Sequence, residues 1–259
     1  MVGVEPSELL DFLGGSRCRV IILSELVEDG PLDREHFNRL FNGSRTTLTR
    51  NLDSLIDREL IERENRTYRL TPKGTYVAEE LLELIKTIRA TSKLNPILAH
   101  VPPAEFDFEP HQLTDATIIK SNPSEPYAPV DKHIARLEAA DQVRCLLPLT
   151  GINSMKTAER RVLNGDAEYE LVVDSRIAEK FRSDSEYSEM LNQMLATGQC
   201  TVYTYEGTFP YYLGLLDDVV QIGVSDEGMP RALLEARSDQ VRKQAEEIYN
   251  KYRNKSILF

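Results

Sequence analysis

The stretch SRTTLTRNLDSLIDRELIERENRTYRLTPKG, residues 44–74, decides the fold of the N-terminal part of this chain. Leu48, Leu52 and Leu55 recur at steps of four and three residues, which is the apolar stripe of one helical face. Ser44 stands just before them and is suited to cap the start of the helix. The first half of the stretch therefore predicts a helix that ends near Glu59.

The apolar pattern changes after Leu60 from a period of 3.6 residues to a period of two. Side chains alternate on both sides of Asn65 and Arg66, which predicts a β-hairpin with a tight turn. Thr71 to Gly74 then begin a further helix. A hairpin placed directly after the helix that ends near Glu59 is a wing.

Two more helices are predicted before the quoted stretch. Apolar residues recur at helical spacing from Ser16 to Glu28, and Gly30-Pro31 ends that helix. A second helix opens near Asp33, stops at Asn42-Gly43 and directs three apolar side chains inward, Phe37, Leu40 and Phe41. The order of helix, short turn with glycine and helix is the helix-turn-helix signature.

Residues 44–74 resemble the winged helix-turn-helix transcription regulators of archaea and bacteria. In that family spaced leucines followed by the pattern Tyr-x-Leu-Thr-x-Lys-Gly are common, and here the pattern runs from Tyr68 to Gly74. The resemblance covers about the first third of the chain. It implies an α+β domain over residues 1–75 whose partner is double-stranded DNA.

Charge is distributed unevenly along the 259 residues, whose formal net charge is -11. Residues 44–73 hold seven Lys or Arg against five acids, a local charge of +2, whereas the remainder holds 24 against 37, or -13. An acidic protein repels DNA unless positive charge is placed locally, as it is here. The 21 Arg against 10 Lys and the pI near 5.0 favour a salt-adapted, haloarchaeal source.

The predicted DNA contacts follow from the geometry of a helix that enters the major groove by its N-terminus. Its first residues meet base edges, hydroxyl and amide groups bind phosphates, and the wing tip enters the minor groove. The predicted residues are Ser44, Arg45, Thr46, Thr47, Thr49, Arg50, Arg63, Asn65, Arg66, Arg69 and Lys73. The alternative is a small α+β domain that contacts protein, as an adaptor of the transcription machinery that does not read bases.

A connecting helix is predicted over residues 76–94, with an apolar seam of Val77, Leu81, Leu84 and Ile88. Two such seams would pair, so we expect a homodimer on a palindromic operator. The alternative is that the seam packs on the second domain of the same chain. Asn95-Pro96 is expected to end the helix, and residues 95–113 are expected to form an extended linker.

Residues 114–259 alternate strand and helix patterns, which predicts an α/β sandwich with a mainly parallel sheet and an antiparallel hairpin at 211–224. This half resembles the middle domain of the archaeal methanogenesis-regulator, or filament-regulator, family. The resemblance rests on VVDSRIAEKF, YYLGLLDDVVQIGVSDEGMPRALLEA and the closing helix. The order of elements is also similar to the phospholipase-D-like effector domains of sugar-sensing archaeal regulators.

Catalysis is not expected in this half. The His-x-Lys pattern of phospholipase D enzymes is absent, because His133 follows Lys132 instead of preceding it by two positions. No nucleophile with a matching base and no phosphate-binding loop stands out. Turnover of a metabolite by residues 114–259 would support the alternative, an enzyme.

A small-molecule effector is expected beyond the carboxyl ends of the strands, where α/β sheets bind ligands. Those ends are the loops 150–154, 174–176 and 205–210. The candidate effector-binding residues are Asp174, Arg176, Tyr205, Glu206 and Tyr211. Asp174 is equally suited to cap the next helix, and the tyrosines to cross-strand packing.

No cofactor or metal is expected. Cys18, Cys145 and Cys200 lie far apart and are interpreted as reduced core residues, and the four histidines share no metal-ligand spacing. No apolar run approaches the roughly 18 residues of a membrane span, and the N-terminus lacks the pattern of a secretory leader. The sequence therefore predicts a cytoplasmic protein without a membrane partner.

Overall fold

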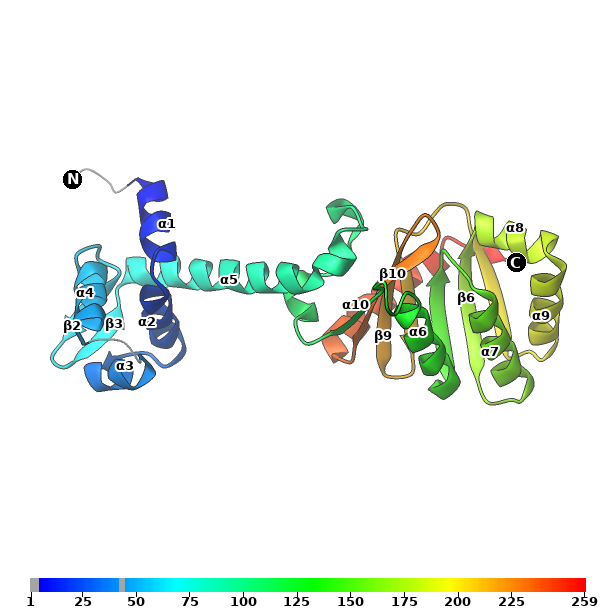
Figure 1. The fold of residues 1–259 in the computed structure, drawn as a ribbon, viewed down its shortest axis with the longest axis horizontal. Helices are drawn as coiled ribbons and strands as arrows, with labels where there is room; N and C mark the ends of the chain where they lie inside the picture. The colour runs from blue at the N-terminus through cyan, green and yellow to red at the C-terminus, as the bar shows by residue number, and fades with distance from the viewer. Residues whose placement is uncertain (1–4, 42–44) are drawn as a thin grey trace. The chain divides into compact units, whose positions relative to one another are not determined.

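The computed structural model describes residues 5–41 and 45–259 (Figure 1). Contacts divide the chain into two compact units, Met1–Ile88 and Arg89–Phe259. The division falls inside helix α5 (Pro72–Leu98), thirteen residues beyond the predicted domain end at residue 75. Each unit has a hydrophobic core of its own. Within the described ranges, no helix has the length and apolar character that crossing a membrane requires.

The first unit is a winged helix-turn-helix. A three-stranded antiparallel sheet of order β1-β3-β2 accompanies its helices, and Ile61 pairs with Leu70 across the hairpin. Asn65 has a φ of 56° at the hairpin turn, a conformation that Asn tolerates better than most residues. Before α5 the elements are α1 (Pro6–Gly14), α2 (Arg17–Glu28), β1 (Leu32–Asp33), α3 (Arg34–Leu40), α4 (Arg45–Ile56), β2 (Ile61–Glu64) and β3 (Thr67–Leu70).

The core of the first unit confirms the predicted apolar stripe of α4. Leu48, Leu52 and Leu55 are buried together with Phe37 of α3. Asp33 caps α3, because its carboxylate accepts a hydrogen bond of 2.8 Å from the backbone N–H of His36. Leu40 was predicted to point inward, but its side chain is 45% exposed at the end of the helix.

The segment 95–113 is not an extended linker. Helix α5 continues through Pro96 to Leu98, and the 3-10 helices η1 (Pro103–Glu105) and η2 (Pro110–Leu113) follow. Proline inside a helix costs about 3 kcal/mol. Burying a large apolar side chain contributes about 1.5–3 kcal/mol, and this segment buries several in the core of the second unit, Ile97, Val101, Phe108 and Leu113. Burial therefore outweighs the local signal of the proline.

An eight-stranded sheet of order β11-β7-β6-β5-β8-β9-β10-β4 organises the second unit. Its helices are α6 (Ala128–Ala139), α7 (Ile152–Leu163), α8 (Ser175–Ser183), α9 (Ser185–Ala196) and α10 (Asp239–Arg253). Its strands are β4 (Thr117–Lys120), β5 (Gln142–Leu147), β6 (Glu168–Asp174), β7 (Cys200–Tyr205), β8 (Tyr212–Leu216), β9 (Val219–Asp226), β10 (Met229–Ala236) and β11 (Ile257–Leu258).

The prediction of a mainly parallel sheet is wrong. In the described part of the chain, parallel pairing is confined to β5 with β6 and β6 with β7. The chain returns after β7 without a crossover helix, so β8 pairs antiparallel with β5, and the turns that follow add β9 and β10 antiparallel. The expected hairpin is thus extended by a strand, β10, that the sequence reading missed.

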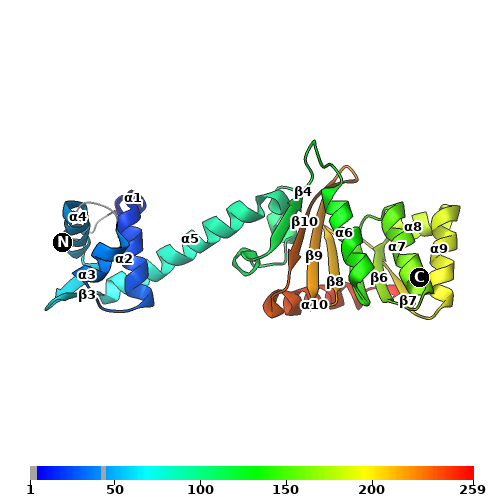
Figure 2. The same ribbon diagram turned by 60° about the horizontal axis from the view of Figure 1, so that its bottom comes forward.

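The sheet lies between two helical layers, which confirms the α/β sandwich (Figures 1 and 2). One face packs on α6, α7, α8 and α9, and the opposite face packs on α10 and residues 94–116. Cys145 and Cys200 are buried in the first of these layers. Both faces of the sheet are therefore covered.

Candidate functional site

The N-terminal half of α4 presents cationic and hydroxyl side chains to solvent. Arg45, Thr46, Thr47 and Arg50 are exposed. Asp53 and Asp57 are exposed farther along the chain, so negative charge follows the second turn. Only the first two turns of the helix therefore suit an approach to a phosphate backbone.

Asn51 fixes the position of α4. Its side chain is only 6% exposed, and its amide Nδ2 donates to the carbonyl oxygen of Thr47 at 2.8 Å. The hydroxyl of Ser16, at the start of α2, donates to Oδ1 of Asn51 at 3.0 Å. The exposed turn thus rests on a buried polar contact between two helices.

Thr49 is bound within the unit. Its hydroxyl donates to the carbonyl oxygen of Arg45 at 2.8 Å and accepts a hydrogen bond from the guanidinium of Arg34. Arg34 is an exposed cation of α3 that sequence reasoning missed, because nothing in the sequence links residues fifteen apart. Ser44, also predicted to contact DNA, lies outside the described residues.

Two of the predicted contacts near the wing are engaged in local bonds. Arg69 forms ion pairs of 2.9 Å with Glu62 and 3.3 Å with Glu64. Lys73 donates to the carbonyl oxygen of Arg58 at 2.9 Å. Exposed ion pairs are worth only about 0.2–1 kcal/mol, so they compete weakly with a phosphate.

The remaining wing residues are more accessible. Asn65 and Arg66 form the exposed tip of the hairpin, and Arg63 lies with its guanidinium 5.8 Å from the ring centre of Tyr68. The structure therefore brings together an exposed helix start and an exposed hairpin tip in one unit.

A further group of arginines lies beside α4. The guanidinium groups of Arg19 and Arg58 lie 3.8 Å and 3.7 Å from the ring centre of Phe12. Burial lowers the pKa of Arg19, and the neighbouring charges of Arg58 and Arg50 lower it further. The positive charge of this unit therefore includes Arg19 and Arg58 in addition to the residues predicted on α4 and the wing.

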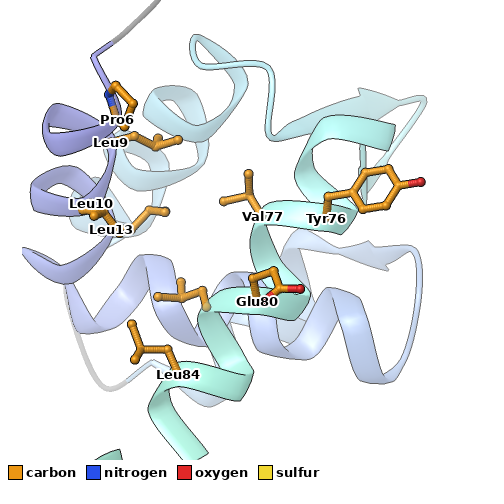
Figure 3. A pocket seen from close by; sticks show the side chains of 9 residues that line it. Pro6, Leu9, Leu10, Leu13, Tyr76, Val77, Glu80 and Leu84 are labelled. Carbon is orange, nitrogen blue, oxygen red and sulfur yellow. The ribbon is translucent and has the colours of Figure 1, made fainter. Parts of the chain in front are cut away.

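An apolar groove of about 610 Å³ separates α1 from the start of α5 (Figure 3). Val77 and Leu81, two residues of the predicted seam, are half-buried there and pack against the core of their own unit. Leu84 is 49% exposed and Leu10 is 60% exposed. The seam is therefore divided between an internal contact and an uncovered apolar edge.

A second cavity, of about 600 Å³, opens in the second unit beyond the carboxyl end of β5. Two of the predicted loops line it, residues 150–154 and the start of α8, together with Phe209 and Pro210 of the third. Of the predicted effector residues, Arg176 and Tyr211 line the cavity. Asp174, Tyr205 and Glu206 are not among its lining residues.

Each of the three residues outside the lining has a different environment. Asp174 is fully buried and caps α8 by accepting from the N–H of Ile177 at 3.0 Å. The ring of Tyr205 stacks on Phe209 at 5.4 Å between centres, which is packing, whereas Glu206 is exposed. Asp174 also binds Nε and Nη2 of Arg176, at 3.2 Å and 2.7 Å, and so orients the guanidinium.

A chain of polar side chains, in which Gln221 of β9 is fully buried and Glu235 of β10 and His133 of α6 are half-buried, reaches the cavity wall at His133. Glu235 accepts a hydrogen bond of 2.9 Å from the Gln221 amide, and the Gln221 oxygen lies 2.8 Å from Nδ1 of His133. Burial lowers the pKa of His133. Since the Gln221 amide nitrogen donates to Glu235, its oxygen accepts from Nδ1, which fixes the neutral tautomer. The sequence alone assigns His133 neither to a catalytic pattern nor to a metal site, and it does not predict its contact with Gln221.

Three potential metal ligands meet in the first unit, although no metal was predicted. Ligand atoms of Glu25, Asp29 and His36 lie within 4.8 Å of one another, and Nε2 of His36 is 2.8 Å from Glu25. His36 belongs to α3, Glu25 belongs to α2 and Asp29 is the C-cap residue of α2, so spacing along the chain does not reveal the group.

Family models match both parts of the chain. Residues 126–255, half of the chain, match the model described as "Methanogenesis regulatory protein FilR1, middle domain". Residues 7–93 match the model described as "HVO_A0261 N-terminal domain". No sequence among curated proteins matches the chain.

Solved structures give weaker likenesses. TrmBL2, an archaeal chromatin protein, is 12% identical with a TM-score of 0.45, over 98% of this chain and 100% of that one. NucT from Helicobacter pylori is 13% identical with a TM-score of 0.46, over 56% and 99%. The phospholipase D family member Nuc from Salmonella typhimurium is 14% identical with a TM-score of 0.44, over 56% and 99%. Since these TM-scores are below 0.5, the family models alone support the assignment. The chain belongs to the family of the middle domain of the methanogenesis regulatory protein FilR1.

Proposed function

We propose that this protein is a sequence-specific DNA-binding transcription regulator. The observation that carries the proposal is the joint exposure of Arg45, Thr46 and Arg50 at the start of α4 and of Asn65 and Arg66 at the wing tip. A helix start fits the major groove, and a cationic hairpin tip fits the narrow minor groove. The regulatory family of the second unit supports the same role.

Replacing Arg45, Arg50 and Arg66 together with Ala tests the proposal. Affinity for a fragment of the protein's own promoter region, measured by fluorescence anisotropy, should fall by at least tenfold because phosphate or base contacts are lost. The control replaces three exposed arginines of the second unit, Arg160, Arg182 and Arg237, and changes the net charge equally. Equal affinity of the two triple variants would favour the adaptor hypothesis, in which the domain does not read bases.

We propose that the regulator works as a homodimer that covers the groove between α1 and α5. Leu10 and Leu84 expose apolar surface on both sides of the groove, and a single winged helix makes few base contacts. The double variant Leu10→Glu with Leu84→Glu should sediment as a monomer, whereas Leu163→Glu, at a leucine of α7 that is 45% exposed, should sediment like the parent. A dimer that persists in the double variant would contradict this arrangement.

We propose that a small molecule bound in the cavity of the second unit changes operator affinity, and that this unit has no catalytic step. The ligand would favour one of two arrangements of the dimer and thereby shift their populations. The position of the cavity beyond the carboxyl end of β5 supports an effector role. Release of a chemically altered molecule by the full chain would contradict the non-catalytic part of the proposal.

A further inference from the structure

We infer that the cavity of the second unit binds a small organic anion, a molecule with an apolar body and one carboxylate or comparable acidic group. The inference deepens the proposed effector role and rests on it for its regulatory meaning. The class of ligand follows from three observations, the apolar walls, the absence of acidic side chains from the lining and two positive elements in the lining.

The walls of the cavity suit an apolar body. Its volume of about 600 Å³ lies in the range of small-molecule sites. Aliphatic and aromatic side chains from α6, the β5–α7 loop and the β9–β10 hairpin form much of the surface: Tyr127, Val130, Leu147, Leu149, Met229 and Leu233. Contacts of this kind give binding energy without selecting a charge.

The lining excludes negative charge. The chain carries 42 Asp and Glu, yet among the described residues that line this cavity none is acidic. Arg176 is the cationic residue of the lining. His133 also lines the cavity, but burial lowers its pKa and keeps the ring neutral. A cationic ligand would therefore find no counter-charge on the wall, whereas an anion finds a guanidinium.

Two positive elements from different parts of the chain line the cavity, after the carboxyl ends of the neighbouring parallel strands β5 and β6. The first is Arg176, whose ion pair with Asp174 uses Nε and Nη2 and leaves Nη1 outside the pair. Asp174 itself is buried and does not line the cavity, so it serves as a positioning residue for the guanidinium. A carboxylate of the ligand can accept from the outer nitrogen of Arg176.

The second positive element is the N-terminus of the twelve-residue helix α7. Residues 151–154 line the cavity, and Gly151 at the N-cap provides no side-chain acceptor for the first turn. The first N–H groups of a helix lack intrahelical partners, and the helix dipole favours an anion there. The two elements together place the acidic group of the ligand between Arg176 and the start of α7.

The test compares two probes of the same shape, naphthalene-1-acetate and its uncharged amide, naphthalene-1-acetamide, by isothermal titration calorimetry on the full chain. The parent should bind the acetate about tenfold more tightly than the acetamide, because hydrogen bonds to charged groups exceed those to neutral ones. Arg176→Gln should remove most of the preference for the acetate, with only the contribution of the α7 N-terminus left, and should leave the affinity for the acetamide unchanged.

Asn153→Asp provides a second variant that does not disturb the ion pair of Asp174. An acid at the start of a helix stabilises the helix, so the variant should fold, while its charge should weaken acetate binding alone. Ser225→Trp, at an exposed residue of the cavity lining, should weaken both probes by occluding the cavity. Arg237→Gln is the matched control, since Arg237 is also exposed and paired with an aspartate but lies outside the cavity.

Equal affinities of the two probes, no acetate binding at millimolar concentration, or an unchanged preference in Arg176→Gln would overturn the inference. Acetate binding that persists in Ser225→Trp would overturn the location. Because calorimetry is done without DNA, a preference for the acetate that depends on Arg176 supports the inference even if the promoter experiment fails.

Discussion

Replacement of Asn51 should lower the free energy of unfolding of the first unit. The buried amide of Asn51 links Ser16, at the N-cap of α2, to Thr47 of α4, so Asn51→Ala leaves the part-buried hydroxyl of Ser16 and the carbonyl of Thr47 without that partner. Losing such contacts costs about 1–3 kcal/mol. Urea denaturation should show this loss in the free energy of unfolding. Asn250→Ala, at an exposed position of α10, is the control and should change it little.

The cysteines should resist chemical modification in the folded protein. Burial raises the pKa of Cys145 and of Cys200 to about 12, so about one thiol in 10⁴ is ionised at pH 8. A disulfide reagent should react first with the half-buried Cys18, and with the other two only after unfolding. The variant Cys18→Ser should therefore show almost no reaction while folded. Immediate reaction of all three thiols would contradict their burial.

The raised pKa values of Cys145 and Cys200 also make the free energy of unfolding depend on pH. A thiol in an unfolded chain titrates near 8.5, below the folded pKa of about 12 for Cys145 and Cys200. The folded state therefore binds these protons more tightly. The contribution of these groups to stability is complete below about pH 8.5 and is lost as the pH rises toward 12.

The close packing of the start of α5 against the end of the α4–β2 turn requires a glycine at position 74. A Cβ on Gly74 would lie 1.7 Å from the carbonyl oxygen of Leu60, which is backbone and cannot move aside cheaply. Gly74→Ala should therefore destabilise the first unit by more than about 2 kcal/mol. Gly14→Ala, at the end of α1 where a Cβ meets nothing within 4 Å, is the control for thermal unfolding. Equal melting temperatures would contradict the close approach.

The elements that the sequence predicts are those with a regular local pattern. The stripe of Leu48, Leu52 and Leu55 identifies α4, and the alternation around Asn65 identifies the wing. Strand β10 was missed because it begins with exposed residues and contains Pro230, and its pairing with β9 is irregular there. The prolines of segment 95–113 predict a linker from the sequence, but the tertiary burial of the segment cannot be seen there.

The residues of the predicted sites likewise fall into two groups, those that a local sequence pattern identifies and those that only tertiary contacts identify. Exposed arginines at the start of a helix can be named from the sequence, but Arg34 and Arg19 join them only through contacts between helices. The loops expected from the topology rule each contribute residues to the lining of the cavity in the second unit. Which side chains line the cavity depends on packing, and Asp174 turned inward to cap α8.

At the scale of the whole molecule, the proposal requires that the two units communicate. If naphthalene-1-acetate changes operator affinity by some factor, DNA must change the affinity for the acetate by the same factor. Calorimetric titration with and without a saturating promoter fragment should show this equality in the parent. In Arg176→Gln both factors should approach one. An acetate affinity of the parent that is the same with and without the promoter fragment would contradict the coupling.

The salt dependence of promoter binding is the most direct test of a DNA interface at the start of α4 and the wing. Each phosphate contact contributes roughly 0.9 to the slope of log affinity against log salt. The triple variant of Arg45, Arg50 and Arg66 should show a slope shallower by about 2–3 than the parent, and the triple variant of Arg160, Arg182 and Arg237 should keep the parent slope. Identical slopes and affinities for all three proteins would contradict a DNA interface at α4 and the wing.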